Sequence, residues 1–288
     1  MILDNTKTVL IVGLGLMGGS YAMALKRKGF RVTAVTLDEE SIDYALKKGL
    51  IDKGSTSPDP ALLAEADLVV FALYPRVLVN WIEENQGGFK PGTLLTDVTG
   101  VKGTVVYDVQ RLLRPDLEFV PAHPMTGREV YGVKNSTDRS FKEANYIVTP
   151  TDKNTPEGIE AVKELGRILG FARISVLSPE EHDEIIAFVS QLAHCLAIVL
   201  MTCNDLEHLE DYTGNSFRDL TRIAHINENM WSELFMMNRE ALLREMTLFE
   251  EQFTRLKHQL QTGDVEAMKE MMRRSTERRD AFDLPKRP

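Results

Sequence analysis

The stretch Thr8–Ser20 reads TVLIVGLGLMGGS, and it decides the fold of the chain. Its first five residues are β-branched or apolar, which predicts a short buried strand. The strand leads into the pattern Gly-x-Gly-x-x-Gly, formed by Gly13, Gly15 and Gly18, and a predicted amphipathic helix follows. Strand, glycine turn and helix in this order are typical of the first unit of a dinucleotide-binding sheet.

Each glycine of this turn has a separate task in such a site. Gly13 permits the tight turn, Gly15 lets a pyrophosphate approach the backbone, and Gly18 lets the helix pack closely on the strand. The free N–H groups and the positive end of the helix dipole, at Leu16 and Met17, favour an anion at the same place. We therefore expect these five residues to contact the cofactor. The alternative is a glycine-rich turn that binds nothing.

The end of the second predicted strand, Arg31–Thr36, bears on which cofactor binds. About 20 residues past the glycines, a carboxylate commonly holds the adenosine ribose, and Asp38 fits that count. Thr36 lies closer to the end of the strand and excludes a 2′-phosphate less strongly than a carboxylate does. Because no arginine directly follows the strand to bind a 2′-phosphate, we expect NAD, with NADP as the alternative. Asp38 is also a candidate N-cap for the helix that starts with Glu39.

The chain changes character near residue 178. Before it, short β-branched runs alternate with helical segments, which predicts a mostly parallel, doubly wound sheet with helices on both faces. After it, strand signals stop and helices dominate. We predict an α/β chain with a Rossmann-type dinucleotide-binding domain over 1–177 and an all-α substrate and dimerisation domain over 178–288. The predicted strands are Thr8–Val12, Arg31–Thr36, Leu68–Ala72, Thr93–Asp97, Phe119–Pro121, Tyr146–Thr149 and Ala172–Val176.

The helical half contains three informative segments. Ser178-Pro179-Glu180-Glu181 is typical of a helix start, with a serine cap and acids at the positive end of the dipole. The segment Ala187–Met201 is apolar on nearly every face, so we expect it to be buried all round. We expect a later apolar seam to form a homodimer, with packing inside one subunit as the alternative. The seam consists of Leu242, Met246, Phe249, Phe253, Leu256 and Leu260.

Composition argues against several classes of function. The 288 residues carry a net charge of −9 and no dominant basic face, so nucleic acid is not expected as a partner. The two cysteines, Cys195 and Cys203, lie too far apart in one helix to bridge. With no recognisable targeting segment, we expect a cytoplasmic protein with reduced thiols and no membrane partner. The six histidines form no metal-binding motif, so no metal is expected.

Three polar residues are candidates for the site. His123, in PAHPMTGRE over 121–129, follows a predicted strand where such sheets open their ligand crevice. A neutral imidazole there can act as a general base, and the alternative is a capping or surface histidine. His194 lies in an apolar helix, either as a core histidine or as a polar group lining a crevice. Arg222 lies between apolar neighbours, so we expect it partly buried against Asp219 or a substrate carboxylate.

Together these segments resemble the prephenate/arogenate dehydrogenase family over nearly the whole chain. The resemblance implies the same two-domain fold, a small-molecule substrate, and a dimer formed by the helical half. It rests on five strings, of which the last three are the more specific. They are VGLGLMGGS (12–20), DVTGVK (97–102), HPMTGRE (123–129), SQLAH (190–194), and FRDLTRIA with MW (217–224 and 230–231).

The resemblance also implies roles for single residues. It makes His123 the catalytic base and places His194 in the substrate pocket. It assigns Arg222 to a substrate carboxylate and Glu129 to the border of the pocket entrance. Trp231, which the sequence alone assigns to core packing, is implied to lie near the site.

Three departures from the family pattern affect the pocket. Gly100 stands where the family commonly has a serine that orients the base, and Thr99 is the candidate to take that part. Gln191 stands where a histidine is often found, and Arg128 where a small residue is usual. We expect Gln191 and Arg128 to border the substrate, and because they change the polarity of the pocket, prephenate and arogenate both stay open.

The implied reaction is the oxidative decarboxylation of prephenate, or of its amino analogue arogenate, on the way to tyrosine. Hydride leaves the hydroxyl-bearing carbon for NAD(P), the base takes the hydroxyl proton, and the ring carboxylate leaves as CO2. A β-hydroxyacid or imine reductase has a similar layout, but it typically uses a helix lysine, and Ala187–Met201 contains none. A non-catalytic NAD(P)-sensing regulator would keep the glycine turn and need neither His123 nor Arg222.

Overall fold

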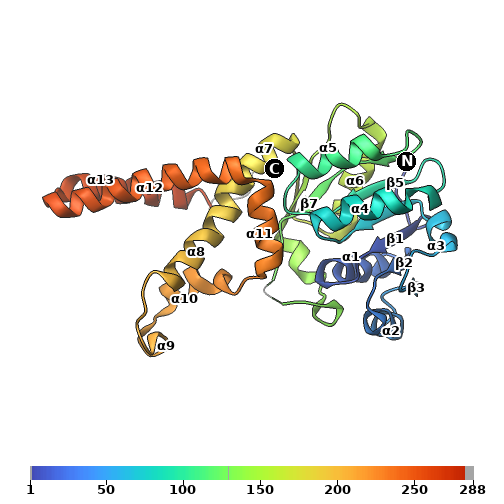
Figure 1. Ribbon diagram of the computed structural model, residues 1–288, viewed down its shortest axis with the longest axis horizontal. Coiled ribbons are helices and arrows are strands. Elements are labelled where there is room, and N and C mark those ends of the chain that lie inside the picture. Colours follow the sequence, from blue (N-terminus) through green and yellow to red (C-terminus); the bar gives the residue numbers. More distant parts are fainter. Residues whose placement is uncertain (1, 129, 283–288) are drawn as a thin grey trace. The chain divides into compact units, whose positions relative to one another are not determined.

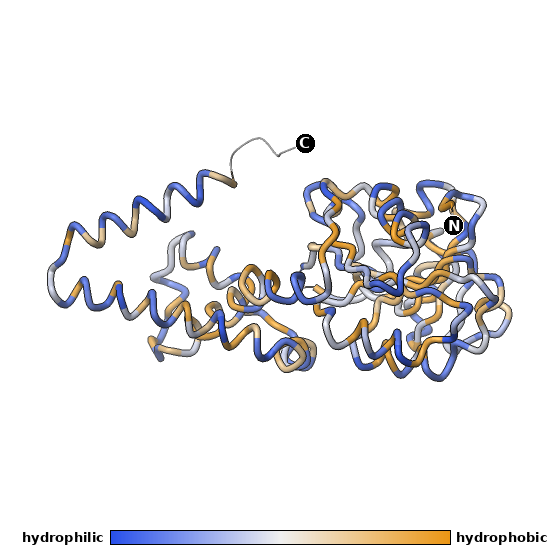
Figure 2. Tube along the Cα trace, turned by 90° about the horizontal axis from the view of Figure 1, so that it is seen from above, coloured by the Kyte–Doolittle hydropathy of each residue, from blue (hydrophilic) through white to orange (hydrophobic). Residues whose placement is uncertain are grey.

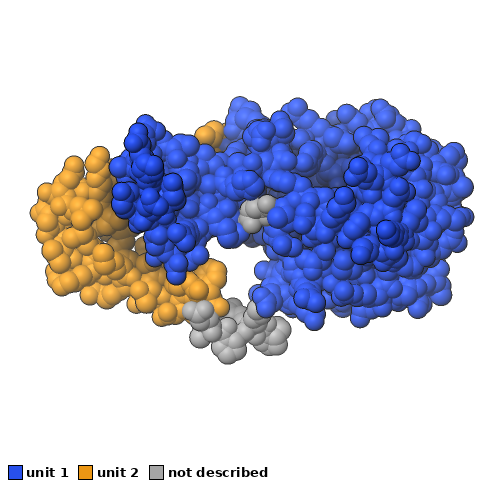
Figure 3. Space-filling view, turned by 90° about the horizontal axis from the view of Figure 1, so that it is seen from below, with its two compact units in different colours: residues 1–239 blue, residues 240–288 orange. Residues whose placement is uncertain are grey.

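The computed structural model describes residues 2–128 and 130–282 of the chain. By its internal contacts the chain divides into two compact units, Met1–Arg239 and Glu240–Pro288, which Figure 3 draws in two colours. Unit 1 contains both β-sheets, and the described part of unit 2 is helical. The functional boundary expected between residues 177 and 178 is a different division, and it stays a prediction.

Unit 1 is built on a parallel six-stranded sheet with the order β3-β2-β1-β4-β5-β6 (Figure 1). The chain moves outward from β1 to β3 and then crosses to the other side of β1 with β4. This switch point opens the crevice in which such sheets bind ligands. The predicted Rossmann-type sheet is therefore confirmed. Its strands are β1 (Thr8–Val12), β2 (Arg31–Val35), β3 (Lys53–Ser55), β4 (Leu68–Phe71), β5 (Leu94–Asp97) and β6 (Glu118–Phe119).

Helices cover both faces of this sheet. Val9 and Ile11 of β1 join one core cluster, whereas Leu10 and Val12 join the other, because successive side chains of a strand point to opposite faces. Residues of α1, α2 and α6 complete the first cluster, and residues of α3, α4 and α5 complete the second. These helices are α1 (Leu16–Arg27), α2 (Glu39–Lys47), α3 (Pro60–Glu65), α4 (Pro75–Asn85), α5 (Gly103–Leu112) and α6 (Pro156–Leu169).

A smaller sheet with the order β7-β8-β9 carries His123. Its strands are β7 (Ala122–Pro124), β8 (Asn145–Val148) and β9 (Arg173–Val176), with β7 antiparallel to β8 and β9 parallel to it. The sequence predicted a single strand over Phe119–Pro121, but β6 ends at Phe119 and β7 starts at Ala122. Pro121 has no N–H for a ladder hydrogen bond, so pairing stops there and the chain changes sheets. His123 is consequently held in a strand, opposite Ile147.

One uninterrupted helix follows this sheet. It consists of α7 (Pro179–Ile186), a π-helical turn η4 (Ala187–Leu192) and α8 (Ala193–Thr202). Its start is as predicted, since the Ser178 hydroxyl accepts the backbone N–H of Glu181 at 3.1 Å while the Glu181 carboxylate accepts the Ser178 N–H at 2.8 Å. Turns of the π type inside α-helices occur frequently at functional sites.

The expectation that Ala187–Met201 is buried all round is wrong. Phe188, Val189 and Val199 are 51%, 52% and 54% exposed. An apolar helix can be covered by its own chain or by a second molecule, and periodicity does not distinguish the two. By length and composition, the 24 residues of Pro179–Thr202 also suffice to cross a membrane, although the sequence led us to expect no membrane partner. Helices of soluble proteins meet the same criteria, so this is weak evidence for a span.

The remaining helices are short in unit 1 and long in unit 2. In unit 2, Gly263, with a φ of +69°, joins two long helices. Of the predicted seam, Leu242 is buried, but Phe249, Phe253 and Leu260 are exposed. Figure 2 shows hydrophobic residues recurring between hydrophilic ones along both helices. The helices are η1 (Gln86–Gly88), η2 (Val133–Asn135), η3 (Arg139–Glu143), α9 (Leu209–Tyr212), α10 (Asn215–Thr221), η5 (Arg222–Ala224), α11 (Glu228–Met237), α12 (Arg239–Thr262) and α13 (Val265–Asp280).

Candidate active site

The glycine turn has a shape that fits a pyrophosphate. Gly13 has a φ of +93°, and a Cβ there would lie 2.4 Å from the carbonyl oxygen of Ala72. A Cβ at Gly18 would lie 2.0 Å from the carbonyl oxygen of Gly13, so only glycine lets α1 approach β1 this closely. At Gly15, in contrast, no atom lies within 4 Å of the Cβ position. This open side adjoins the start of α1 at Leu16, where free N–H groups favour an anion.

Thr36 and Asp38 lie just beyond β2. Thr36 directly follows the strand, and its N–H donates to the carbonyl oxygen of Ser55 at 3.1 Å. Asp38 occupies the N-cap position of α2, but its exposed carboxylate accepts the Ser41 hydroxyl instead of a helix N–H. The carboxylate thus orders the start of α2 and is exposed to solvent. The predicted contact with a ribose stays a prediction.

The segment that follows β7 lies against α1. Leu16 and Met17 line a small pocket together with Thr126 and Arg128. The fold therefore brings the candidate substrate segment next to the candidate cofactor turn, although more than 100 residues of chain separate them. Arg128 is exposed. Glu129, expected at the pocket entrance, lies outside the described residues.

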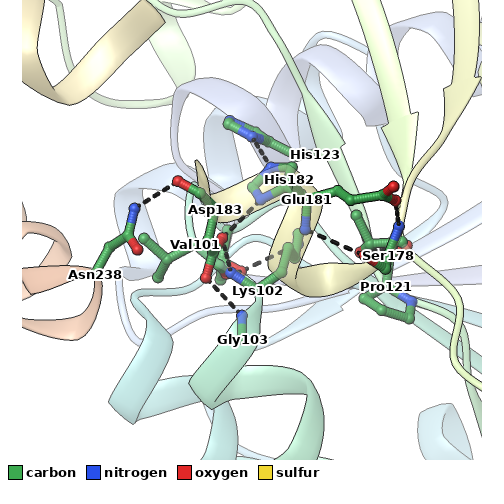
Figure 4. A network of polar contacts seen from close by, with 12 residues as sticks. Val101, Lys102, Gly103, Pro121, His123, Ser178, Glu181, His182, Asp183 and Asn238 are labelled. Carbon is green, nitrogen blue, oxygen red and sulfur yellow. Dashed lines mark hydrogen bonds and ion pairs between the residues drawn. The ribbon is translucent and has the colours of Figure 1, made fainter. Parts of the chain in front are cut away.

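His123 is held by two residues of α7. Its Nδ1 lies 2.8 Å from Nε2 of His182, and Nδ1 of His182 lies 2.7 Å from Oδ1 of Asp183 (Figure 4). The Asp183 carboxylate also accepts the backbone N–H groups of Lys102 at 2.8 Å and Gly103 at 2.7 Å. These contacts join β7, α7 and the start of α5 at a single point.

A fully buried ion pair adjoins His123. Nζ of Lys102 lies 2.6 Å from Oδ2 of Asp97 and 2.6 Å from the carbonyl oxygen of Ala122, which precedes His123 in β7. The hydroxyl of Thr99, also buried, binds Asp97 and lies 3.2 Å from Nζ of Lys102. Thr99 is thus linked to His123 only indirectly, through this ion pair and the backbone of Ala122. Its expected part in orienting the base stays a prediction.

Burial sets the charge of the two imidazoles. Burial lowers the pKa of His123 well below its usual value, and repulsion from His182 and Lys102 acts in the same direction. Burial also lowers the pKa of His182, against the opposing effect of Asp183. Because the usual value is about 6.5, both imidazoles are neutral near pH 7. A neutral histidine can accept a proton, which an imidazolium cannot.

The second ring nitrogen of His123, Nε2, lies next to Gly100. A Cβ on Gly100 would lie 3.8 Å from this nitrogen and 3.7 Å from Cδ1 of Leu234 on α11. The missing side chain of Gly100 thus leaves room beside Nε2, between the loop after β5 and α11. This is the nitrogen that can receive a proton from a bound molecule.

Two predicted residues lie together on α8 and α11. The ring of His194 packs on that of Trp231, with centroids 3.6 Å apart. Nδ1 of His194 lies 2.9 Å from the carbonyl oxygen of Ser190, so it carries the proton of that hydrogen bond. Trp231 and Leu234 are three residues apart on α11, which puts them on one face of the helix. This face connects His194 to the space beside Nε2 of His123.

Gln191 lies one turn before His194 and is buried. Its amide donates to the carbonyl oxygen of Leu234 at 3.0 Å and accepts a hydrogen bond from Asn238 at 2.8 Å. These bonds attach the π-helical turn to α11. The expected contact of Gln191 with the substrate stays a prediction.

Arg222 starts the 3-10 helix η5, which packs against α8. The expectation that it is partly buried is wrong, since it is exposed. The apolar neighbours of Arg222 do not form a buried face, because Leu220 is itself 64% exposed. Contact with α8 places Arg222 on the same group of helices as His194.

The residues predicted from the sequence do not include His182, Asp183 and Lys102 of this cluster. His182 is 59 residues from His123, and Asp183 is 81 residues from Lys102. Their only local signals are a histidine beside an aspartate near a helix start and a lysine directly before a helix. Both signals are common on solvated helices, so only the tertiary contacts assign them to the site.

The fold and these groups together define a class of protein. The fold has a doubly wound sheet and a glycine turn open to a pyrophosphate, and the strand of the neutral His123 leads into the segment beside that turn. These are the features of a dinucleotide-dependent dehydrogenase. Residues 21–175 match the family of the prephenate dehydrogenase nucleotide-binding domain, and residues 178–274 match the prephenate dehydrogenase dimerisation domain. The chain belongs to the prephenate dehydrogenase family.

Individual relatives are similar over almost the entire chain. It is 29% identical to prephenate dehydrogenase of Bacillus subtilis over 286 residues, which cover 96% of this chain and 76% of that protein. It is 28% identical to cyclohexadienyl dehydrogenase of Zymomonas mobilis, with 96% of each protein covered. The crystal structure of Aquifex aeolicus prephenate dehydrogenase with hydroxyphenyl propionate and NAD+ superposes with a TM-score of 0.88 at 30% identity, covering 98% of this chain and 99% of that one.

Gly15→Ala tests the cofactor turn without disturbing the fold. The added methyl group meets no atom within 4 Å, so the Tm should stay at the wild-type value. The methyl group enters the space that a pyrophosphate needs, so we expect the Kd for NAD to rise at least about tenfold. Calorimetric titration measures the Kd. Gly13→Ala is the contrast, because its methyl group meets the Ala72 carbonyl and should lower the Tm. An unchanged Kd for Gly15→Ala would contradict the assignment of the turn.

Proposed function

We propose that this chain catalyses the oxidative decarboxylation of prephenate to 4-hydroxyphenylpyruvate with NAD, a step of tyrosine biosynthesis. Membership of the prephenate dehydrogenase family over two matched domains supports the activity. The similar Aquifex aeolicus enzyme was crystallised with NAD+ and hydroxyphenyl propionate, which supports the cofactor and an aromatic acid in the site. The observation that carries the proposal is His123, which is neutral, engaged at Nδ1 and next to an open position at Nε2.

His123 is the proposed general base. Its Nε2 takes the proton of the substrate hydroxyl as hydride leaves the same carbon. NAD, when bound at the glycine turn, accepts that hydride. The ring carboxylate then leaves as CO2. The electron pair of the broken carbon–carbon bond makes the ring aromatic and places a negative charge on the former hydroxyl oxygen. That oxygen takes a proton back from His123. Because aromatisation drives the cleavage, the protein contributes orientation and charge placement.

The substrate carboxylates need cationic or polar partners. We assign one of them to Arg222, whose planar guanidinium matches a carboxylate in two hydrogen bonds. His194 and Trp231 form the proposed wall of the pocket, since they stack on each other beside the helix that carries Leu234. Arg128, in the segment that borders the cofactor turn, is proposed to approach the substrate as well.

The proposed cofactor contacts are Gly13, Gly15 and the first residues of α1 for the pyrophosphate, and Asp38 for the adenosine ribose. The exposed carboxylate of Asp38 repels a 2′-phosphate, which favours NAD over NADP. We further propose that residues 1–177 bind the cofactor, and that residues 178–288 form the dimer interface and add substrate contacts to those of His123 and Arg128. The two family matches, 21–175 and 178–274, support this division.

Arogenate and a non-catalytic role are the alternatives. Arogenate differs from prephenate by an ammonium group in place of the side-chain carbonyl, and no residue discussed above favours it. A regulator that only senses NAD would bind the cofactor without turning over prephenate. Absorbance at the NADH band, with each substrate and with NAD or NADP, decides among them. A flat trace with prephenate beside tight NAD binding would favour the sensor.

We propose a homodimer formed through the helical half. The matched domain over 178–274 is a dimerisation domain in the family. Val199 of α8 and Phe253 of α12 are 54% and 60% exposed, and such apolar surface is stabilised by burial. A second copy fits this surface better than a bilayer does, because Gln191 and His194 interrupt the apolar helix with polar groups.

A cytoplasmic location is proposed on the state of the cysteines. Cys195 and Cys203 are both free, and Cys203 is exposed. Exposed thiols remain reduced in the cytosol and oxidise in secreted proteins. The net charge of −9 gives no attraction for nucleic acid.

His123→Asn should lower kcat for prephenate by roughly 10²- to 10⁴-fold, the usual contribution of a general base, with little change in KM. His258→Asn, an exposed histidine of α12, is the control and should keep wild-type rates.

The kcat of the wild type should depend on pH, because only the neutral form of His123 can act as the base. It should be full above the lowered pKa of His123 and fall only as the pH drops through that pKa, below about 6.5. Near-normal turnover of His123→Asn, or a loss of kcat already above pH 6.5, would contradict the assignment.

Arg222→Ala should raise KM for prephenate roughly 10- to 100-fold, because a charge-assisted bond to a carboxylate contributes about 1.5–3 kcal/mol. Steady-state kinetics measures this, with the Kd for NAD as the internal control. Arg218→Ala, one turn earlier and also exposed, should leave KM near the wild-type value. Equal KM values for Arg222→Ala and the wild type would remove Arg222 from the site.

Phe253→Glu should convert the proposed dimer to a monomer, because it puts a charge into the apolar seam of α12. Light scattering coupled to size-exclusion chromatography measures the mass. Glu251→Gln, two residues away and exposed, is the matched control and should stay dimeric. A wild-type chain with monomer mass at micromolar concentration would rule the dimer out.

A further inference from the structure

The series of hydrogen bonds that ends at His123 starts at the carboxylate of Asp183. Asp183 accepts two backbone N–H groups at the start of α5, from Lys102 and Gly103, at 2.8 and 2.7 Å. A backbone N–H group can only donate, so both oxygens of the Asp183 carboxylate act as acceptors here. An ionised carboxylate has only lone pairs to offer. The Nδ1 atom of His182, 2.7 Å from Oδ1 of Asp183, must therefore carry a proton.

The polarity of this first bond fixes the second. His182 has no exposed surface, and its burial lowers its pKa, so it is neutral and holds a single ring proton. With that proton on Nδ1, its Nε2 bears a lone pair and can only accept. The partner 2.8 Å away, Nδ1 of His123, is therefore the donor. A neutral His123 with its proton on Nδ1 has its lone pair on Nε2, the nitrogen next to Gly100.

We propose that His182 and Asp183 are positioning residues that hold His123 in the tautomer with a basic Nε2 facing the substrate, through the chain Asp183–His182–His123 (Figure 4). This inference rests on the proposed function in one respect, that His123 is the catalytic base. Free imidazole rings in proteins place their proton on either nitrogen, and the bond made by one nitrogen decides the state of the other. Without His182 as an acceptor, His123 is free to carry its proton on Nε2, where it cannot act as a base.

The hydrogen bonds Asp183–His182–His123, which we call the relay, have a second effect during turnover. When Nε2 of His123 takes up a proton, the ring becomes positive and its Nδ1–H binds His182 more strongly. The carboxylate of Asp183, on the far side of the His182 ring, carries the negative charge that compensates the positive charge of His123. The other charged groups near this ring are Lys102 at the start of α5, whose ammonium repels the imidazolium, and Asp97 of β5, which forms an ion pair with Lys102. Asp183 acts against this repulsion, because its hydrogen bond favours a proton on His182, and Gly100 and Leu234 carry no charge.

The contacts around Asp183 show how its position is secured. Nδ2 of Asn238, at the end of α11, donates to the backbone carbonyl oxygen of Asp183 at 2.8 Å. The same amide nitrogen lies 2.8 Å from Oε1 of Gln191. Because Asp183 also caps α5, changing it would disturb the fold and the relay together. The experiment therefore varies His182, which makes one bond on each side.

Nitrogen-15 spectra of the histidine side chains test the tautomer directly on the whole protein. In the wild type, His123 should show a protonated Nδ1 and an unprotonated Nε2, with its signals assigned by their loss in His123→Asn. In His182→Leu, which removes the acceptor, the Nε2-protonated form of His123 should appear. A wild-type His123 protonated on Nε2, or the same tautomer in both proteins, would overturn the proposal. This readout needs no substrate, so it stands even if prephenate is not turned over.

Kinetics with prephenate supplies the second readout. We expect His182→Leu to lower kcat by about 10- to 100-fold with KM nearly unchanged, because part of the general-base contribution is lost. His182→Gln keeps an acceptor oxygen within reach of Nδ1 of His123, so it should recover much of the rate. The Kd for NAD reports on the fold, and His258→Leu is the control.

The outcomes separate the two hypotheses. Equal loss in the Leu and Gln variants, with tautomers unchanged, would mean that His182 only fills space, and the relay would be wrong. Absence of prephenate turnover in the wild type, with the tautomer shift present, would remove the proposed function and leave the relay standing.

Discussion

The buried ion pair between Lys102 and Asp97 is the interaction on which the rest of the site depends. A buried ammonium group is costly unless its protons all find acceptors, and here they meet Asp97, Thr99 and the carbonyl oxygen of Ala122. Asp97 ends β5 and Ala122 starts β7, so the pair ties the large sheet to the small one. His123 follows Ala122 directly. Removing one charge would leave the other buried, at about 3–5 kcal/mol.

A single carboxylate connects this ion pair to the helical half. Asp183 caps the start of α5 with its two oxygens and binds His182 with one of them. The same carboxylate therefore fixes both the packing of α7 on α5 and the orientation of His123. Asn238 extends it to α11 through the backbone of Asp183. His123 is thus supported by elements from both sides of residue 177, which is why a cut at that residue does not separate two compact units.

The helical half is only partly explained by the contacts of one chain. Apolar residues of α8 and of the α12 seam remain exposed, although their spacing is that of packed helices. Apolar periodicity predicts that one face of a helix packs against a partner, but it does not distinguish a partner in the same subunit from one in a second subunit. The expectation of complete burial for Ala187–Met201 failed for this reason. A second copy of the chain is the partner that the family match supports.

The sequence by itself determined the doubly wound sheet and the cofactor turn. Strands buried on both faces are apolar runs, and the requirement for Gly13 and Gly18 is set by neighbours in the same strand–turn–helix unit. It also singled out His123. Only the tertiary structure revealed β7, the ion pair of Lys102 and the contact with His182. Those features depend on contacts between residues that are distant in the sequence, such as His123 and His182, which are 59 positions apart. The local sequence pattern does not predict such contacts.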